Sequence, residues 1–203
     1  MSTISSPKWE RIQSALAGRS IMTTAELQVL GVSREYVRQL VIAGRLEKVA
    51  RGLFRLPDAD FGLDFSIAEA ARIVPNGVVC LLSALRLHRV TTQSPFDVWM
   101  AVEAGQWVSR QSVLPIRFVR PGGSSFQEGI ERHIIEGVDV RVYSLAKTVA
   151  DCFKYRSKVG LAVALEALRE SQREKRASVD DVWHYARVCR VANVMRPYLE
   201  AID

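Results

Sequence analysis

Apolar residues recur at helical spacing in three short segments of the first quarter of the chain. The segments follow Pro7, a capping box over residues 23–26 and a capping serine at Ser33, and glycines end each of them. The second and third segments are joined through Gly31, which is typical of a helix-turn-helix. The third predicted helix has an apolar face formed by Val37, Leu40 and Val41. Its other face is polar and carries Arg34, Glu35, Arg38 and Gln39.

A β-hairpin is predicted directly after these helices. Two β-prone stretches, residues 45–49 and 53–57, flank a turn whose Gly52 can adopt a positive φ. A hairpin in this position is the wing of a winged helix-turn-helix. Its tip carries Arg51 and its arms carry Lys48 and Arg55, where basic side chains can contact phosphates or a minor groove.

The remaining residues alternate between β-prone and helical patterns. A capping box over residues 66–69 is expected to open a helix, and residues 78–88 are expected to form another. Strands are predicted at 97–102, 116–119 and 138–143, each bounded by glycine or proline. Three helices then follow, the first capped by Ser144, the second carrying Leu161, Leu165 and Leu168, and the third capped by Ser178.

Strands followed by a run of helices are typical of an α+β fold. The sequence therefore predicts an N-terminal winged helix-turn-helix followed by a mixed α/β C-terminal domain that ends in a helical run. The expected domains are a DNA-binding domain at 1–60, a helical connector at 61–90 and a C-terminal domain at 91–203.

The positive charge of the chain is concentrated in the winged segment. The 203 residues carry a formal net charge of +6. Residues 1–55 hold nine basic and four acidic side chains, a net charge of +5, whereas the other 148 residues hold 19 basic and 18 acidic ones. A basic segment attached to a nearly neutral remainder indicates a surface for an anionic partner such as nucleic acid. Arginine and glutamine on the third helix suit guanine and adenine edges in a major groove.

Other protein classes have little support in the sequence. The three cysteines are widely spaced and odd in number, so a disulfide framework is not expected, and each is expected to be a small buried hydrophobe. No apolar run is long enough to span a bilayer and the N-terminus lacks a signal-peptide pattern, which favours a cytoplasmic protein without membrane association.

Catalytic patterns are also lacking. The three histidines are scattered without metal-ligand spacing, and the acids Asp97 and Glu103 lack the lysine that a restriction-type nuclease site needs. We therefore expect no enzyme activity, no metal and no cofactor.

One charged pair in the C-terminal half has two interpretations. Lys147 and Asp151 are four residues apart on a predicted helix, so they form either a surface or half-buried ion pair, or a contact that is structural or faces a partner. Residues 169–176 form a mixed-charge run that is either a solvated face or a contact for DNA or an acidic protein surface.

Two sets of motifs resemble the AbiEi-type antitoxins, which are winged-helix regulators of abortive-infection toxin–antitoxin systems. The first set is Leu-Gly-Val-Ser-Arg at 30–34, Gly-Arg-Leu-Glu-Lys-Val at 44–49 and Arg-Gly-Leu-Phe-Arg-Leu-Pro at 51–57, where Phe54 replaces the more usual tyrosine. The second set runs from Arg141 to Lys154 and continues with Gly160 and Glu166-Ala-Leu-Arg. Together they cover about a third of the chain in the order of a full-length family member.

The resemblance implies two functions. The winged helix would bind double-stranded DNA at an inverted repeat in its own promoter and repress its operon, and dimerisation on the DNA is compatible with this. The C-terminal domain would counteract a nucleotidyltransferase-like toxin of a type IV system without forming a stable complex with it. The alternative from the residues is a winged-helix repressor whose C-terminal domain senses a ligand or protein and has no toxin partner.

These inferences define two sets of candidate residues. The expected DNA-binding residues are Arg34, Tyr36, Arg38, Gln39, Arg45, Lys48, Arg51 and Arg55. The candidates in the antitoxin domain are Lys147, Asp151, Lys154 and Arg169.

Overall fold

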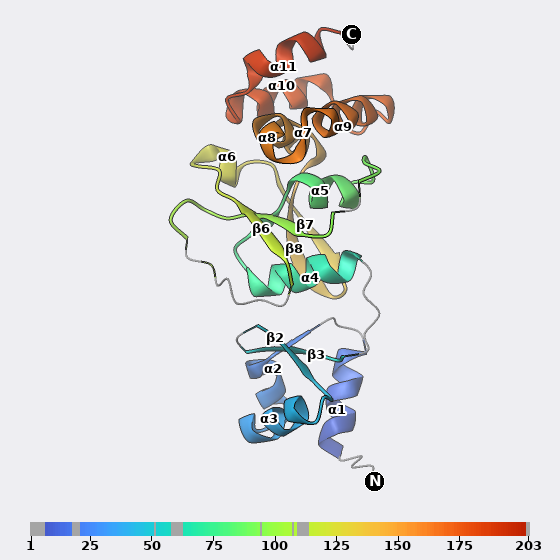
Figure 1. The fold of residues 1–203 in the computed structure, drawn as a ribbon, viewed down its shortest axis with the longest axis vertical. Coiled ribbons are helices and arrows are strands. Elements are labelled where there is room, and N and C mark those ends of the chain that lie inside the picture. The colour runs from blue at the N-terminus through green and yellow to red at the C-terminus, as the bar shows by residue number, and fades with distance from the viewer. Residues whose placement is uncertain are drawn as a thin grey trace. The chain divides into compact units, whose positions relative to one another are not determined.

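The fold is seen in a computed structural model, which describes residues 7–17, 21–50, 52–57, 63–93, 95–106, 108 and 114–201 (Figure 1). The chain divides into two compact units. The first consists of Met1–Pro75, Val108–Leu114 and Ile134–Asp139, and the second consists of Asn76–Trp107, Pro115–His133 and Val140–Asp203. The first division falls within the predicted 61–90 connector. The functional domain limits at 1–60, 61–90 and 91–203 remain predictions.

The first unit begins with three helices and a small antiparallel sheet in the order β1-β3-β2. Its elements are α1 (Pro7–Leu16), β1 (Met22–Thr23), α2 (Thr24–Val29), α3 (Arg34–Ile42), β2 (Glu47–Ala50), β3 (Leu53–Arg55) and α4 (Leu63–Ile73). The predicted caps are present: Thr23 and Glu26 bond to each other's backbone N–H, and Ser33 accepts from the Tyr36 N–H at 3.3 Å. The helix-turn-helix and the wing, which is the β2–β3 hairpin, are therefore observed where the sequence predicts them.

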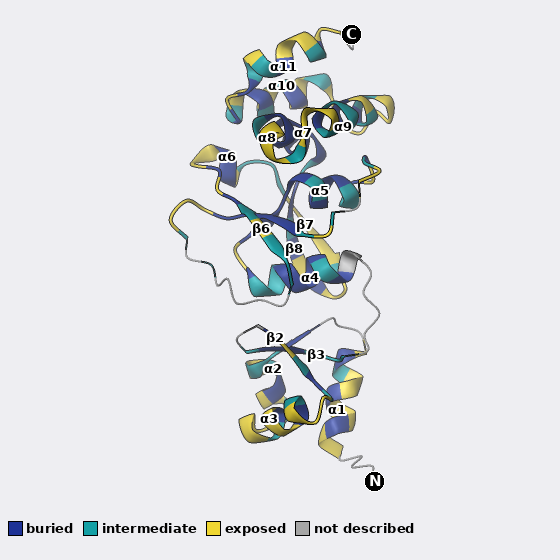
Figure 2. Cartoon of the chain, viewed as in Figure 1, coloured by how far each residue is buried: buried dark blue, intermediate teal, exposed yellow. Residues whose placement is uncertain are grey.

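Burial explains how these short elements hold together. Trp9, Ile12 and Leu16 form the buried stripe of α1, and they share a core with Val37 and Leu40 of α3. Figure 2 shows the same helices exposing their opposite faces. Because isolated helices of this length are unstable in water, this shared core rather than helix propensity stabilises them.

The larger sheet is mixed and five-stranded, in the order β6-β5-β4-β8-β7, and most of its residues belong to the second unit. Its strands are β4 (Val78–Val79), β5 (Val98–Ala101), β6 (Ile116–Val119), β7 (Ile130–Ile135) and β8 (Val138–Tyr143). β4 pairs in parallel with β8 and antiparallel with β5, which in turn pairs in parallel with β6. The strands predicted at 97–102, 116–119 and 138–143 are confirmed as β5, β6 and β8.

Helices between the strands and after the last strand complete the α+β fold. They are α5 (Leu81–Leu87) and α6 (Ser124–Gln127), which lie between strands, and α7 (Leu145–Lys154), α8 (Arg156–Val159), α9 (Leu161–Arg173), α10 (Val179–Val188) and α11 (Ala192–Leu199) after β8. α7 packs against α5, α9, α10 and α11. Every residue from Leu145 to Phe153 is buried as a result. The predicted fold class, including the final helical run, is confirmed.

Several local predictions are wrong. The capping box expected at residues 66–69 lies inside α4, because that helix already begins at Leu63 and Glu69 forms a tertiary contact described below. The helix expected at 78–88 is a strand, β4, followed by the shorter α5. The three cysteines are buried and free, as expected.

Candidate nucleic-acid interface

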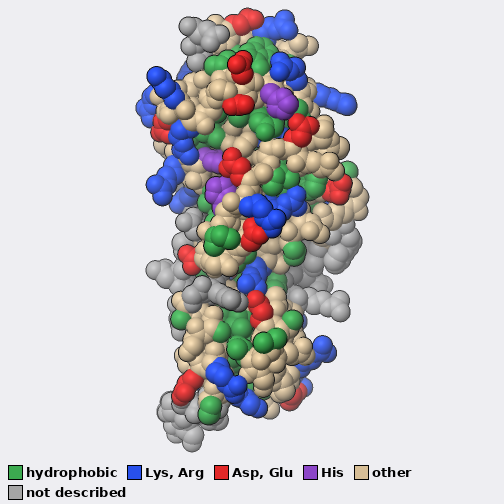
Figure 3. All heavy atoms as spheres, turned by 180° about the vertical axis from the view of Figure 1, so that it is seen from behind, with side chains coloured by type: hydrophobic (Ala, Val, Ile, Leu, Met, Phe, Trp, Pro, Cys, Tyr) green, Lys and Arg blue, Asp and Glu red, His purple; other side chains and the backbone are tan. Residues whose placement is uncertain are grey.

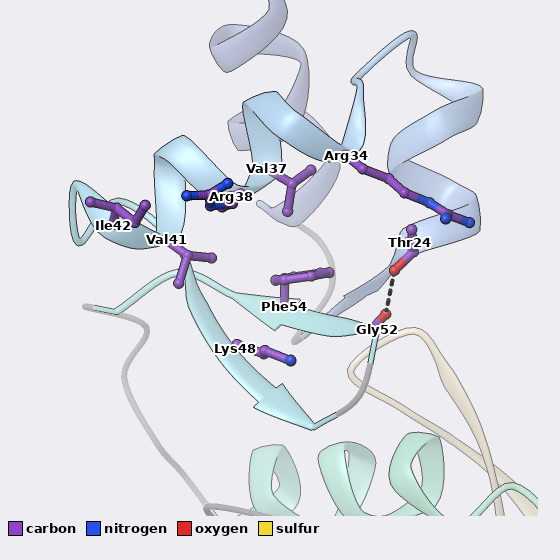
Figure 4. Close-up of a pocket in the computed structure, with 9 residues that line it drawn as sticks. All are labelled: Thr24, Arg34, Val37, Arg38, Val41, Ile42, Lys48, Gly52 and Phe54. Carbon is purple, nitrogen blue, oxygen red and sulfur yellow. Dashed lines mark hydrogen bonds between the residues drawn. The ribbon is translucent and has the colours of Figure 1, made fainter.

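A groove separates α3 from the wing within the first unit. It has a volume of about 530 Å³, and we refer to it as the recognition groove. Its lining residues are Thr24, Arg34, Val37, Arg38, Val41, Ile42, Lys48, Gly52 and Phe54. In Figure 4 the α3 side chains lie along one side, whereas Lys48 and Phe54 rise from β2 and β3 on the other. The groove therefore has an apolar floor with basic side chains around it.

Three of the predicted DNA-binding residues meet at this groove. Arg34, Arg38 and Lys48 are all exposed. The carboxylate of Glu35 lies 3.6 Å from the Arg38 guanidinium, but Arg38 and Glu35 are 71% and 64% exposed, and such surface pairs restrain a charge weakly. The three cations are therefore available to an anionic ligand.

The wing is tied to the start of α2 at its tip. The Gly52 carbonyl accepts a hydrogen bond from the Thr24 N–H at 2.8 Å and another from the Thr24 hydroxyl at 3.3 Å. Gly52 has a φ of +75°, and a Cβ at this position would lie 3.1 Å from the Thr24 hydroxyl oxygen. Glycine is thus required for the turn that holds the wing against the helix-turn-helix. Arg51, predicted at the wing tip, lies outside the described residues.

The other predicted DNA-binding residues have different surroundings. Tyr36 is half-buried and packs against the core, and Gln39 is exposed but does not line the groove. The Arg45 guanidinium lies 4.1 Å from the centre of the Trp9 ring, in a cation–π contact. All three remain predicted DNA contacts.

Arg55 requires a correction, because its charge is used inside the protein. Its guanidinium donates to Glu47 Oε2 at 2.7 Å and to Glu69 Oε2 at 3.1 Å, and only 14% of the side chain is exposed. Burial raises the pKa of Glu69, an effect that the Arg55 charge opposes. Arg55 therefore links the wing to α4. It is not available for the phosphate contact that the sequence predicted.

A second link joins α4 to the helix-turn-helix. Arg72, one turn after Glu69, donates to Glu26 Oε1 at 3.0 Å and Oε2 at 2.9 Å. Burial alone would raise the pKa of Glu26, but the hydrogen bonds from Thr23 and Arg72 outweigh it and the pKa is lowered. Glu26 thus completes the capping box and anchors α4 at the same time.

The lowered pKa of Glu26 predicts an acid-sensitive contribution to stability. A carboxyl whose pKa is lower in the folded state stabilises the protein above its unfolded value, here 4.5, and this stabilisation disappears as the pH falls through the folded-state pKa. We expect the Tm of Glu26→Gln to lie below that of the wild type at neutral pH and to approach it in acid. Thermal unfolding monitored by circular dichroism across the pH range measures this, with Glu200→Gln, an exposed residue beyond α11, as the control. A difference in Tm between Glu26→Gln and the wild type that stays constant down to pH 3 would contradict the prediction.

In the second unit, the candidate pair Lys147 and Asp151 is completely enclosed. The side chains are 0% and 2% exposed, and Lys147 Nζ donates to Asp151 Oδ2 at 2.6 Å. Lys147 Nζ also lies 4.0 Å from the centre of the Tyr143 ring, and the Cys189 thiol donates to Asp151 Oδ1 at 3.2 Å. The expectation of a surface or half-buried pair is wrong, and a toxin-facing role is excluded by the same burial. The pair is structural.

The other two candidates of the second unit are more accessible. Lys154 is half-buried and its Nζ donates to the Cys189 carbonyl at 3.1 Å, which joins the ends of α7 and α10. Arg169 is exposed on α9. Both remain candidates for a partner contact.

The second unit also contains a polar cavity of about 460 Å³. It is lined by His88, Glu131, His133, Ser144, Leu145, Ala146, Arg176, Ala177, Asp181 and Tyr185. His88 Nε2 donates a hydrogen bond to the Tyr143 carbonyl at 2.8 Å, and burial lowers the pKa of its imidazole. Figure 3 shows histidine, acidic and basic side chains gathered on this side of the unit. Sequence reasoning missed this cavity because its residues come from β7, α7, α10 and connecting segments that are far apart in the sequence.

Among the residues that the structure describes, no three His, Cys, Asp or Glu side chains are grouped so that they could hold a metal ion. Among the helices of the described residues, none combines the length and apolar character needed to cross a membrane.

A helix-turn-helix followed by a wing, with three exposed cations around one groove, defines a winged-helix DNA-binding domain. Residues 10–57 match a family model described as a transcriptional regulator, AbiEi antitoxin. The crystal structure of the RV2827C protein from Mycobacterium tuberculosis has a similar fold, with a TM-score of 0.63 and 12% identity over 88% of this chain and 71% of that one. At this identity the likeness concerns the fold alone. A search of curated proteins produced no match.

These findings define the N-terminal part of the protein. Residues 10–57 are similar to the AbiEi antitoxin transcriptional regulators, in agreement with the resemblance of the motifs at 30–34, 44–49 and 51–57. The matched family is one of transcriptional regulators, which is consistent with the expectation of a regulator rather than an enzyme.

Proposed function

We propose that the protein represses its own operon by binding an inverted repeat in its promoter through the recognition groove. The observation that carries this proposal is the convergence of Arg34, Arg38 and Lys48 on one groove of an AbiEi-type regulator domain. Arg34 and Arg38 lie on successive turns of α3, the helix that a winged helix inserts into the major groove. Lys48 lies across the groove on the wing, where a phosphate contact is expected.

The direct test is a gel-shift titration with the promoter DNA upstream of the gene, compared with random duplex of the same length. Repression also predicts that a reporter driven by this promoter is silenced by the full chain. Equal affinity for promoter and random DNA would refute sequence-specific repression.

Lys48→Ala should weaken binding to promoter and random DNA by a similar factor. Because each phosphate that a protein neutralises contributes about −0.9 to the slope of log K against log salt, the variant should flatten that slope by about 0.9 per protomer. Gel shifts between 50 and 200 mM salt measure the slope. Lys158→Ala, an exposed lysine of α8 in the second unit, is the control that should leave it unchanged. An unaltered slope for the Lys48 variant would remove Lys48 from the interface.

We also propose that the second unit counteracts a nucleotidyltransferase-like toxin without forming a stable complex. The motifs at 141–154 and 160–169 support this assignment. A full-length Arg34→Ala, Arg38→Ala variant should still rescue growth when it is co-expressed with the product of the neighbouring gene, because these residues belong to the DNA-binding unit. Lys154→Ala and Arg169→Ala test the two accessible candidates. If the DNA-binding variant fails to rescue although it folds and accumulates, neutralisation depends on DNA binding and the division of labour is wrong.

A second candidate function is a repressor that senses a small molecule. The polar cavity of the second unit favours it, because convergent charged and polar groups in a cavity of this size suit a small ligand. The neighbouring gene separates the two functions. A nucleotidyltransferase-like product whose toxicity the chain relieves supports the antitoxin, and a chain that relieves no toxicity supports the sensor.

A further inference from the structure

One apolar side chain of the recognition groove is much more exposed than its neighbours. Ile42, the last residue of α3, is 73% exposed, whereas Val37 of the same groove is 4% exposed and Phe54 is 9% exposed. Ile42 is therefore not part of the hydrophobic core of the unit. Figure 4 shows its side chain at the end of the groove, beyond Arg38 along α3.

Ile42 continues the line of basic residues that α3 presents. Arg34, Arg38 and Ile42 are spaced by four residues, so they lie one above another on the same side of the helix. Successive members of this line are separated by about 6 Å along the helix axis. Two base pairs span about 7 Å at roughly 3.4 Å each. A helix lying along a major groove would place each side chain of this line about two base pairs from the next.

Resting on the proposed function, we infer that Ile42 is a specificity-determining residue that packs on the 5-methyl group of a thymine. The thymine methyl is the apolar group that base edges display in the major groove. Arg38, one turn before Ile42 on α3, suits a guanine. Lys48, across the groove on the wing, would hold the phosphate that brings this edge within reach of Ile42. The operator therefore contains a thymine about two base pairs from the guanine read by Arg38.

The test removes the methyl group from the DNA and leaves every hydrogen-bonding group in place. Full-length protein first selects its preferred duplex from a random pool, and each thymine of that duplex is then replaced by deoxyuridine. Burying one methyl group against an apolar partner is worth about 0.8 kcal/mol, which corresponds to a roughly four-fold change in Kd. We expect deoxyuridine at one or two positions to weaken wild-type binding by this factor. Deoxyuridine at the other positions should leave the Kd unchanged.

Protein variants show whether the sensitivity to the thymine methyl group depends on Ile42. Ile42→Ala should bind the thymine and deoxyuridine duplexes within a factor of about 1.5 of each other at the same positions. Val29→Ala is the matched control, because Val29 is 87% exposed on α2 but lies outside the recognition groove. It should keep the four-fold preference. Both side chains are exposed, so neither change should lower the Tm, and thermal unfolding checks this.

The outcomes distinguish this inference from the proposed function. If the selection returns no preferred sequence, sequence-specific DNA binding fails, and the role of Ile42 fails with it. If a preferred sequence emerges but no thymine is methyl-sensitive, or Ile42→Ala keeps the sensitivity, the repressor proposal stands and the inference about Ile42 is overturned.

Discussion

Replacing Lys147 with methionine is expected to lower the free energy of unfolding by about 3–5 kcal/mol, the usual cost of removing one partner of a buried ion pair. The change leaves the Asp151 carboxylate without its cation in a site that is 2% exposed. Burial raises the pKa of Asp151, and the Lys147 charge holds that shift back. Urea unfolding of the full chain, monitored by circular dichroism, measures the loss.

The pH dependence and a double variant give this prediction its controls. Without Lys147, the folded-state pKa of Asp151 rises further, so the stability loss should be largest at neutral pH and shrink as acid protonates the carboxyl. Lys147→Met combined with Asp151→Leu removes both charges and should recover most of the loss, since buried pairs can often be replaced by apolar residues. A single variant that loses less than 1 kcal/mol would show that solvent reaches the pair.

The double variant Arg34→Ala, Arg38→Ala is expected to lose between about 30-fold and 10⁴-fold of its affinity for the operator. This range follows if each arginine makes one bidentate base contact worth about 1–3 kcal/mol. Affinity for random duplex should fall much less, because base contacts are absent there. Fluorescence anisotropy with the two DNAs at one salt concentration measures the difference.

A matched control separates the site from general loss of charge. Arg187 of α10 is exposed, like Arg38, but it belongs to the second unit. Arg187→Ala should bind the operator as the wild type does. Equal losses for operator and random DNA in the double variant would show that Arg34 and Arg38 contact only phosphates.

Predictions in the first unit succeeded where the signals are local. The capping box at Thr23 and Glu26, the Ser33 cap and the wing turn at Gly52 each involve atoms within a few residues of one another. The same local reading failed for Glu69, whose position in a capping-box pattern was coincidental. Glu69 instead binds Arg55, fourteen residues away in the sequence.

Predictions in the second unit missed the elements with weak patterns. β7 is exposed along most of its length, so it lacks the alternation of apolar and polar residues that reveals a half-buried strand. α8 is four residues long, and α11 contains Pro197 in its interior, which is unfavourable to a helix by propensity. β4 is a two-residue strand inside a segment whose apolar residues also suit a helix.

The sequence by itself determined that the protein carries a basic winged helix at its N-terminus, because helix caps, glycine turns and local charge depend on neighbouring residues. Only the tertiary structure decided which charges remain available. Folding brings Glu69 to Arg55 and encloses Lys147 with Asp151, yet it leaves Arg34, Arg38 and Ile42 exposed at one groove. Burial and ion pairing depend on residues far apart in the chain, and the spacing of residues along a helix does not encode them.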